Sequence, residues 1–141
     1  MYCYKYPHPA VTADCIVFNR EGNTISILLI KRKNEPFKDC WAFPGGFVNI
    51  DESAEDAAIR ELKEETGLEV SHIEQLKAYS NPDRDPRERV ITIAFMAESE
   101  IKDVKGGDDA KEARWFDISN LPALAFDHEQ ILKDALEKLK N

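Results

Sequence analysis

Residues 45–70, GGFVNIDESAEDAAIRELKEETGLEV, combine a glycine turn with a segment rich in carboxylates. Paired glycines after a proline interrupt regular structure, so the stretch opens with a turn. Ser53 suits a helix N-cap and Gly67 suits a helix C-cap, and neither Gly nor Pro lies between them. We therefore predict a helix over residues 54–66.

Three carboxylates of this helix lie on one face. Glu61, Glu64 and Glu65 are spaced i, i+3 and i+4, which places them within an arc of about 100°. Like charges at this spacing repel one another unless a cation lies between them, and Mg²⁺ typically binds a few carboxylates together with water and phosphate oxygens. The spacing alone usually indicates only a solvated helix face, so the flanking residues decide between a metal site and a plain surface.

The whole stretch resembles the signature of the Nudix hydrolase family. That signature is Gly, five residues, Glu, seven residues, and then Arg-Glu-apolar-x-Glu-Glu-x-Gly-apolar. Its nine fixed positions are matched by Gly46, Glu52, Arg60, Glu61, Leu62, Glu64, Glu65, Gly67 and Leu68. The resemblance implies metal-dependent hydrolysis of the pyrophosphate bond of a nucleoside diphosphate derivative, with water as the nucleophile.

The resemblance also implies roles for single residues. The helix carboxylates and the carbonyl of Gly45 would bind Mg²⁺ or Mn²⁺. Arg60 would form a salt bridge with Glu52 that holds the carboxylates in position, or would instead pair with Glu64 four residues on. The general base stays open among four acids: Glu61, Glu64, Asp109 and Glu112.

The substrate expectation comes from residues 81–89, NPDRDPRER, which two prolines mark as an irregular loop. Such a loop is often only solvated, but it is similar to that of Nudix members that act on ADP-ribose. Arg suits bidentate contacts to phosphate, so Arg84 and Arg87, together with Gly46, are expected to bind substrate. His128 packs near the last helix or contacts substrate. The favoured reaction is ADP-ribose to AMP and ribose 5-phosphate; the alternatives are a nucleoside triphosphate pyrophosphohydrolase and a non-catalytic ADP-ribose sensor.

The remaining segments complete one domain over residues 1–141. Strands are predicted at residues 10–18, 25–30, 41–47, 70–80, 90–97 and 113–116, and a terminal amphipathic helix at residues 129–140. Strands on both sides of a central helix, followed by a second helix, predict an α/β fold, an α/β/α sandwich with a mixed sheet. The Nudix resemblance implies the same fold.

Charge and composition limit the possible partners. The net charge is −8, and residues 51–69 hold eight acids against two bases. Nucleic acid is therefore an unexpected partner, because binding to it depends on basic contacts to phosphate. An anionic nucleotide substrate would be repelled as well, unless a divalent ion inverts the local charge.

Other functional classes lack their motifs. The sequence contains no P-loop, no G-x-G-x-x-G, no G-x-S-x-G and no H-E-x-x-H. Three cysteines without a C-x-x-C pair predict free thiols, with Cys15 in the core. No membrane span or signal peptide is apparent, which favours the cytoplasm. Alternating tyrosines at positions 2, 4 and 6 predict an edge strand or an extended arm, which in a homodimer could contact the second subunit.

Overall fold

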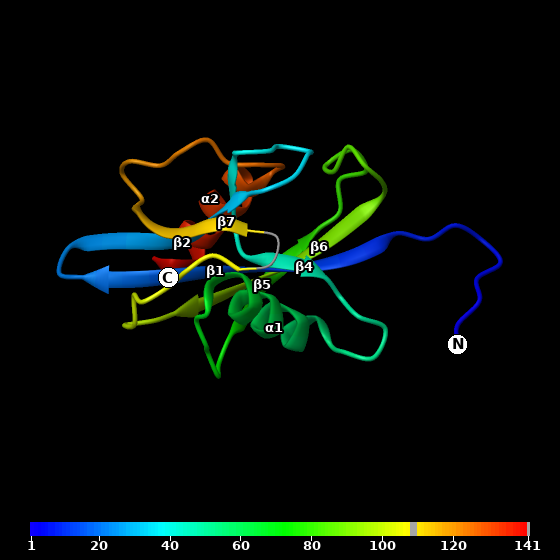
Figure 1. Cartoon of the computed structure of the whole chain (residues 1–141), viewed down its shortest axis with the longest axis horizontal. Coiled ribbons are helices and arrows are strands. Elements are labelled where there is room, and N and C mark those ends of the chain that lie inside the picture. Colours follow the sequence, from blue (N-terminus) through cyan, green and yellow to red (C-terminus); the bar gives the residue numbers. More distant parts are fainter. Residues whose placement is uncertain (108–109, 141) are drawn as a thin grey trace.

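The computed structural model of the protein describes residues 1–107 and 110–140 (Figure 1). Within these residues there are seven strands and two helices. In chain order they are β1 (Ala10–Glu21), β2 (Thr24–Arg32), β3 (Trp41–Ala42), β4 (Gly45–Phe47), α1 (Ala54–Thr66), β5 (Glu74–Tyr79), β6 (Val90–Glu98), β7 (Ala110–Asp117) and α2 (His128–Leu139).

The strands form one mixed sheet with the order β3-β2-β1-β6-β5, to which β4 adds beside β1 and β7 beside β2. The β1–β6 pair is parallel and the other pairs are antiparallel. Strand β1 changes its antiparallel partner along its length: residues 12–14 pair with β4, and residues 18–21 pair with β2. The cleft described below is lined by residues of these three strands.

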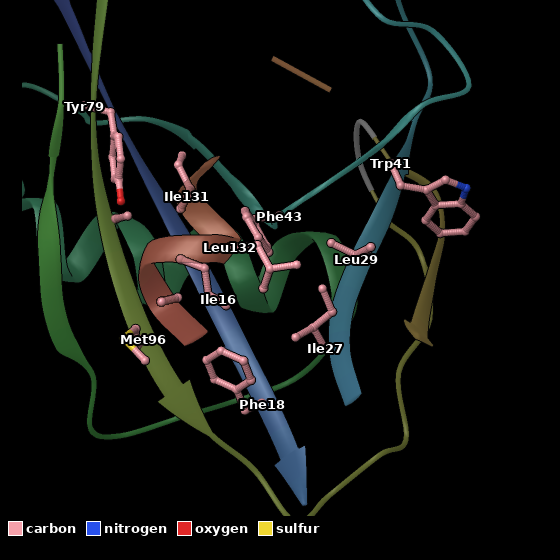
Figure 2. Close-up of a cluster of buried hydrophobic side chains, with 12 residues drawn as sticks. Ile16, Phe18, Ile27, Leu29, Trp41, Phe43, Tyr79, Met96, Ile131 and Leu132 are labelled. Carbon is pink, nitrogen blue, oxygen red and sulfur yellow. The ribbon is translucent and has the colours of Figure 1, made fainter. Parts of the chain in front are cut away.

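Each face of the sheet is covered by one helix. Alternate residues of β1 divide between two apolar clusters: Ile16 and Phe18 pack in the cluster under α2, and Cys15 and Val17 in the cluster under α1. Figure 2 shows the first cluster, in which the buried α2 side chain Ile131 lies over the central strands. Because side chains of a strand alternate between faces, one apolar strand supplies both layers. The predicted α/β/α sandwich with a mixed sheet is confirmed.

The boundaries of α1 are those predicted. Ser53 Oγ accepts a hydrogen bond of 3.1 Å from the N–H of Asp56, and Gly67 adopts a left-handed conformation (φ +79°) at the C-cap. Leu62 faces the core and is fully buried. The helix is thus fixed at both ends and along its apolar face, and its carboxylates lie on the neighbouring face.

Other segments differ from the predictions. The single strand predicted at residues 41–47 is two short strands, because the chain crosses at Phe43 and Pro44 from pairing with β2 to pairing with β1. The strand predicted from Val70 begins only at Glu74. Of the two forms predicted for the N-terminal tyrosines, the extended arm is the one observed: residues 1–9 form no strand and extend away from the body, with exposed tyrosines (Figure 1). Cys15 is buried as predicted and the cysteines are free; Trp41 and Phe43 are buried as well. In the described part of the chain, no helix is both long and apolar enough to span a membrane.

Candidate active site

A cleft of about 380 Å³ opens beside the glycine turn, a volume that suits a small-molecule ligand. One side of it is acidic and comes from α1. The other side comes from the loops before β3, before β6 and before α2 and carries basic and aromatic side chains. The residues that line the cleft include Asp14, Gly46, Glu61, Glu65, Arg87 and His128.

Arg60 is the centre of a network on the acidic side. Its guanidinium donates hydrogen bonds to both carboxylate oxygens of Glu52 (2.6 and 3.0 Å), to Glu61 (2.7 Å), to Glu64 (3.1 Å) and to the carbonyl of Phe47 (3.1 Å). Both pairings expected from the sequence therefore exist together. The hydrogen bond to Arg60 lowers the pKa of Glu52, and the hydrogen bond to Glu52 contributes most to the raised pKa of Arg60.

The glycine turn packs directly against the carboxylates of α1. The N–H of Gly45 donates a hydrogen bond of 2.8 Å to Oε1 of Glu65, whose side chain is buried. A Cβ at Gly46 would lie 2.6–2.8 Å from the carboxylate atoms of Glu61. With the Glu61 carboxylate in its present position there is no room for a side chain at position 46, and any larger residue would displace this carboxylate.

Two of the three arginines of the 81–89 loop, Arg84 and Arg87, line the cleft but differ in exposure. Arg84 is 4% exposed and donates two hydrogen bonds to Asp127 (2.7 and 2.9 Å). Burial is the largest single influence and opposes its charge, but the hydrogen bonds to Asp127 and the attraction of the neighbouring acids together outweigh it and raise the pKa of Arg84. Arg87 is 39% exposed, pairs with the buried Asp85 (2.7 Å) and lies 5.7 Å from the ring centroid of Phe126. Arg87 is the better placed of the two to reach a ligand.

Two polar residues in the cleft lie outside the stretch that the sequence singled out. The buried carboxylate of Asp14 accepts a hydrogen bond of 2.7 Å from the hydroxyl of Thr92. His128 begins α2; its Nδ1 accepts a hydrogen bond of 3.1 Å from the N–H of Phe43, and its Nε2 lies 3.7 Å from Asp14 Oδ2. Burial lowers the pKa of His128, although Asp14 opposes the shift. A charged residue inside the apolar run AVTADCIVF was the signal for Asp14.

The model of the NUDIX domain matches residues 8–139. The chain belongs to the Nudix family. The family prediction is thereby confirmed, and the nine fixed positions fall on the glycine turn and on α1 with its flanking residues.

Individual Nudix relatives resemble most of the chain. It is 56% identical over 129 residues to the "ADP-ribose pyrophosphatase" of Methanocaldococcus jannaschii, covering 92% of this chain and 74% of that protein. It is 34% identical over 141 residues to the "ADPR responsive transcriptional repressor NtrR" of Acinetobacter baylyi, covering 96% of this chain but only 56% of that protein.

Solved structures agree with the fold. A MutT/nudix family protein from Enterococcus faecalis superposes with a TM-score of 0.91 at 36% identity, covering 99% of this chain and 65% of that one. The NUDIX domain of Shewanella oneidensis NrtR, crystallised with ADP ribose, superposes with a TM-score of 0.89 at 30% identity, covering 95% of this chain and 90% of that one.

Nudix hydrolases generally depend on divalent metal, and the donor set here suits such an ion. Glu61, Glu65 and Gly45 line the cleft and offer hard oxygen atoms, which Mg²⁺ and Mn²⁺ prefer. Glu64 is more exposed and points to Arg60. Within residues 1–107 and 110–140, no three His, Cys, Asp or Glu side chains are already grouped as a metal site. Arg60 is the counter-charge of Glu61 and Glu64 here, so a bound ion would compete with its guanidinium for these carboxylates.

Of the two acids expected from the turn before β7, Asp109 and Glu112, the structure describes Glu112 alone. Glu112 lies on β7, where it accepts a hydrogen bond of 2.9 Å from Arg114, and it is absent from the lining among the described residues. Asp109 lies outside the described residues. A role for either as general base stays a prediction, and Glu61 and Glu64 are the candidates that the structure places beside the glycine turn or Arg60.

Proposed function

We propose that this chain is a metal-dependent Nudix pyrophosphohydrolase that cleaves ADP-ribose to AMP and ribose 5-phosphate. The proposal of ADP-ribose as the substrate rests on the 56% identity, over 92% of the chain, to a protein named ADP-ribose pyrophosphatase. The reaction class is supported by the intact Nudix signature, of which Glu61, Glu65 and the glycine turn line one cleft.

In this proposal the carboxylates of Glu61, Glu64 and Glu65 and the carbonyl of Gly45 hold Mg²⁺ or Mn²⁺. When bound, the ion would neutralise the diphosphate and lower the pKa of a coordinated water. Water attacks one phosphorus atom, the phosphoanhydride bond breaks, and a carboxylate of the cleft accepts the proton of the water. Arg60 contributes by holding two of these carboxylates and Glu52 in one network.

The basic side of the cleft is proposed to bind the substrate. Arg87 offers a guanidinium beside the rings of Phe47 and Phe126, and Gly46 allows the ligand to approach the backbone. Arg84 supports this side through its pair with Asp127. A homodimer, a cytoplasmic location and the absence of nucleic-acid binding belong to the same proposal and stay predictions.

A second candidate is a non-catalytic ADP-ribose sensor. It is favoured by the 34% identity to a protein named an ADPR responsive transcriptional repressor. A degraded signature would support it, but every fixed position of the signature is intact in this chain. A nucleoside triphosphate pyrophosphohydrolase is the other enzymatic alternative.

The deciding experiment measures product release from ADP-ribose, NADH, diadenosine polyphosphates and the dNTPs, with Mg²⁺ and with chelator. We expect metal-dependent AMP from ADP-ribose at a rate well above the other compounds. Hydrolysis of nucleoside triphosphates alone would contradict the assignment of ADP-ribose as the substrate. Tight binding of ADP-ribose without turnover would place the chain in the sensor class.

A further inference from the structure

Asp14 is a buried carboxylate with unused acceptor capacity. A carboxylate has about four acceptor positions, and among the described residues Thr92 is the hydrogen-bond donor that the structure gives it. The nearby guanidinium of Arg84 attracts its charge but donates its own hydrogen bonds to Asp127. Burying a carboxylate with so few donors is costly, and Asp14 has no part in the metal site proposed above.

His128 supplies a matching donor. Because its Nδ1 accepts the N–H of Phe43, the proton of the neutral ring lies on Nε2. That Nε2 is 3.7 Å from Asp14 Oδ2, which is longer than a hydrogen bond, so the two groups are not satisfied by one another. Both residues line the cleft. A donor and an acceptor therefore stand side by side on its floor.

The glycine turn packs closely against this floor. A Cβ at Gly45 would lie 2.1 Å from Asp14 Oδ1, so no side chain at position 45 is compatible with the present place of the carboxylate. On the other side of Gly45, its N–H bonds Glu65. Gly45 thus lies between Asp14 and Glu65, one of the carboxylates that would hold the metal.

A hydroxyl group fits such a pair, because it donates to a carboxylate and accepts from an N–H. A phosphate does not, because a buried carboxylate repels it. We propose that Asp14 and His128 bind a hydroxyl of the sugar attached to the diphosphate, and that they select nucleoside diphosphate sugars over nucleotides that end in phosphate. This inference rests on the proposed function, whose diphosphate it places beside the carboxylates of α1.

The test compares two substrates that share the same phosphoanhydride. ADP-ribose carries the sugar, and adenosine 5′-(methyl diphosphate) carries a methyl group in its place; both yield AMP. We expect Asp14→Asn to lower kcat/KM for ADP-ribose about 10- to 100-fold, mainly through KM, as loss of a hydrogen bond to a charged group predicts. For the methyl ester, the kcat/KM of Asp14→Asn should differ from that of the wild type by less than about threefold. The ratio of the two kcat/KM values is the readout, because a general loss of structure would lower both equally.

Two further variants keep the outcome clear. Asp103→Asn, at an exposed position, should leave the ratio unchanged. His128→Asn keeps an acceptor for the N–H of Phe43 and removes the Nε2 donor; it should lower the ratio, and it decides the question if Asp14→Asn does not fold. An unchanged ratio in a folded variant, or an equal loss of kcat on both substrates, would overturn the inference. Failure of the proposed function would instead show in the wild type, as no AMP from ADP-ribose.

Discussion

The N–H of Gly45 donates a hydrogen bond of 2.8 Å to Oε1 of Glu65, and this bond joins the glycine turn to the carboxylate face of α1. Glu65 is 5% exposed, although it is an acid on a helix with an exposed face. Acids are almost never this buried unless they are paired or bind a cation. The bond therefore fixes a proposed metal ligand against the glycine turn.

Replacing the proposed metal ligands by their amides should abolish turnover. We expect Glu65→Gln and Glu64→Gln to lower kcat for AMP release by orders of magnitude, because a metal ion supplies several kcal/mol of transition-state stabilisation. Glu69→Gln is the matched control, since Glu69 is exposed and pairs only with Lys63 among the described residues. A kcat within about threefold of the wild-type value would contradict the assignment of these residues as metal ligands, because loss of the metal is expected to lower kcat far more.

The two glycines of the turn should respond differently to alanine. A methyl at position 45 would lie 2.4 Å from the backbone carbonyl of Ala13, which cannot move aside, so Gly45→Ala should destabilise the fold. The atoms nearest to a methyl at position 46 are the carboxylate end of the Glu61 side chain, which can shift where a backbone carbonyl cannot, so Gly46→Ala should keep the melting temperature close to the wild type and lower kcat. Thermal melting and steady-state kinetics on both variants test this contrast. Equal melting temperatures for the two variants would disprove it.

His128 should make stability depend on pH. Its pKa in the folded state is lowered by burial, so folding favours the neutral ring. This contribution is complete above the unfolded value of about 6.5 and is lost as the pH falls below it toward the folded pKa. The melting temperature should therefore fall between pH 7.5 and pH 5, and less steeply in His128→Asn. His72→Asn, at an exposed position, should keep the wild-type slope. Identical slopes for wild type and His128→Asn would rule the effect out.

Much of the fold follows from local rules in the sequence. The caps of α1 follow from Ser53 and Gly67, whose side-chain oxygen and φ value are local properties. The alternation in β1 identifies apolar residues for both faces of a sheet. The crossing of the chain at Pro44 was missed, because it depends on which strands the two halves of the segment pair with. Pairing between distant strands is not visible in a single short stretch.

The site was predictable only where its residues are close in sequence. The pair of Arg60 with Glu64 follows from the i,i+4 spacing on α1, whereas its pair with Glu52, which precedes the helix, was expected from the family resemblance. Asp14, Thr92 and His128 come from three distant segments, and tertiary packing alone brings them together. The sequence signal for Asp14 was a charge within an apolar strand, which indicates burial but names no partner.

Arg60 should be difficult to replace by lysine. One guanidinium bonds Glu52, Glu61 and Glu64 at once, whereas an ammonium lacks the planar fork needed for all three. We expect Arg60→Lys to lower kcat about 10- to 100-fold, as is typical when a group that orients metal ligands is lost. The melting temperature should change little, because the network is partly exposed to water. Arg20→Lys, which alters an exposed pair with Glu98, should leave kcat unchanged. Wild-type kcat in Arg60→Lys would exclude this positioning role.

The two loop arginines should separate into a structural and a ligand-binding role. Arg84 is buried against Asp127, so Arg84→Lys loses a bidentate pair out of water and should lower the free energy of unfolding by about 2 kcal/mol. Arg87 is exposed to the cleft but also neutralises the buried Asp85, so lysine is a better replacement than alanine. We expect Arg87→Lys to raise KM for ADP-ribose several-fold with little change in stability, because a planar bidentate donor is lost.

Chemical denaturation and kinetics on both lysine variants distinguish these roles. If Arg84→Lys instead raises KM at unchanged stability, its guanidinium leaves Asp127 to bind the ligand, and the assignment of the two arginines reverses. If neither variant alters KM, the basic side of the cleft does not contact the substrate. The ligand would then have to be held by the metal, by the backbone at Gly46 and by the polar groups on the cleft floor.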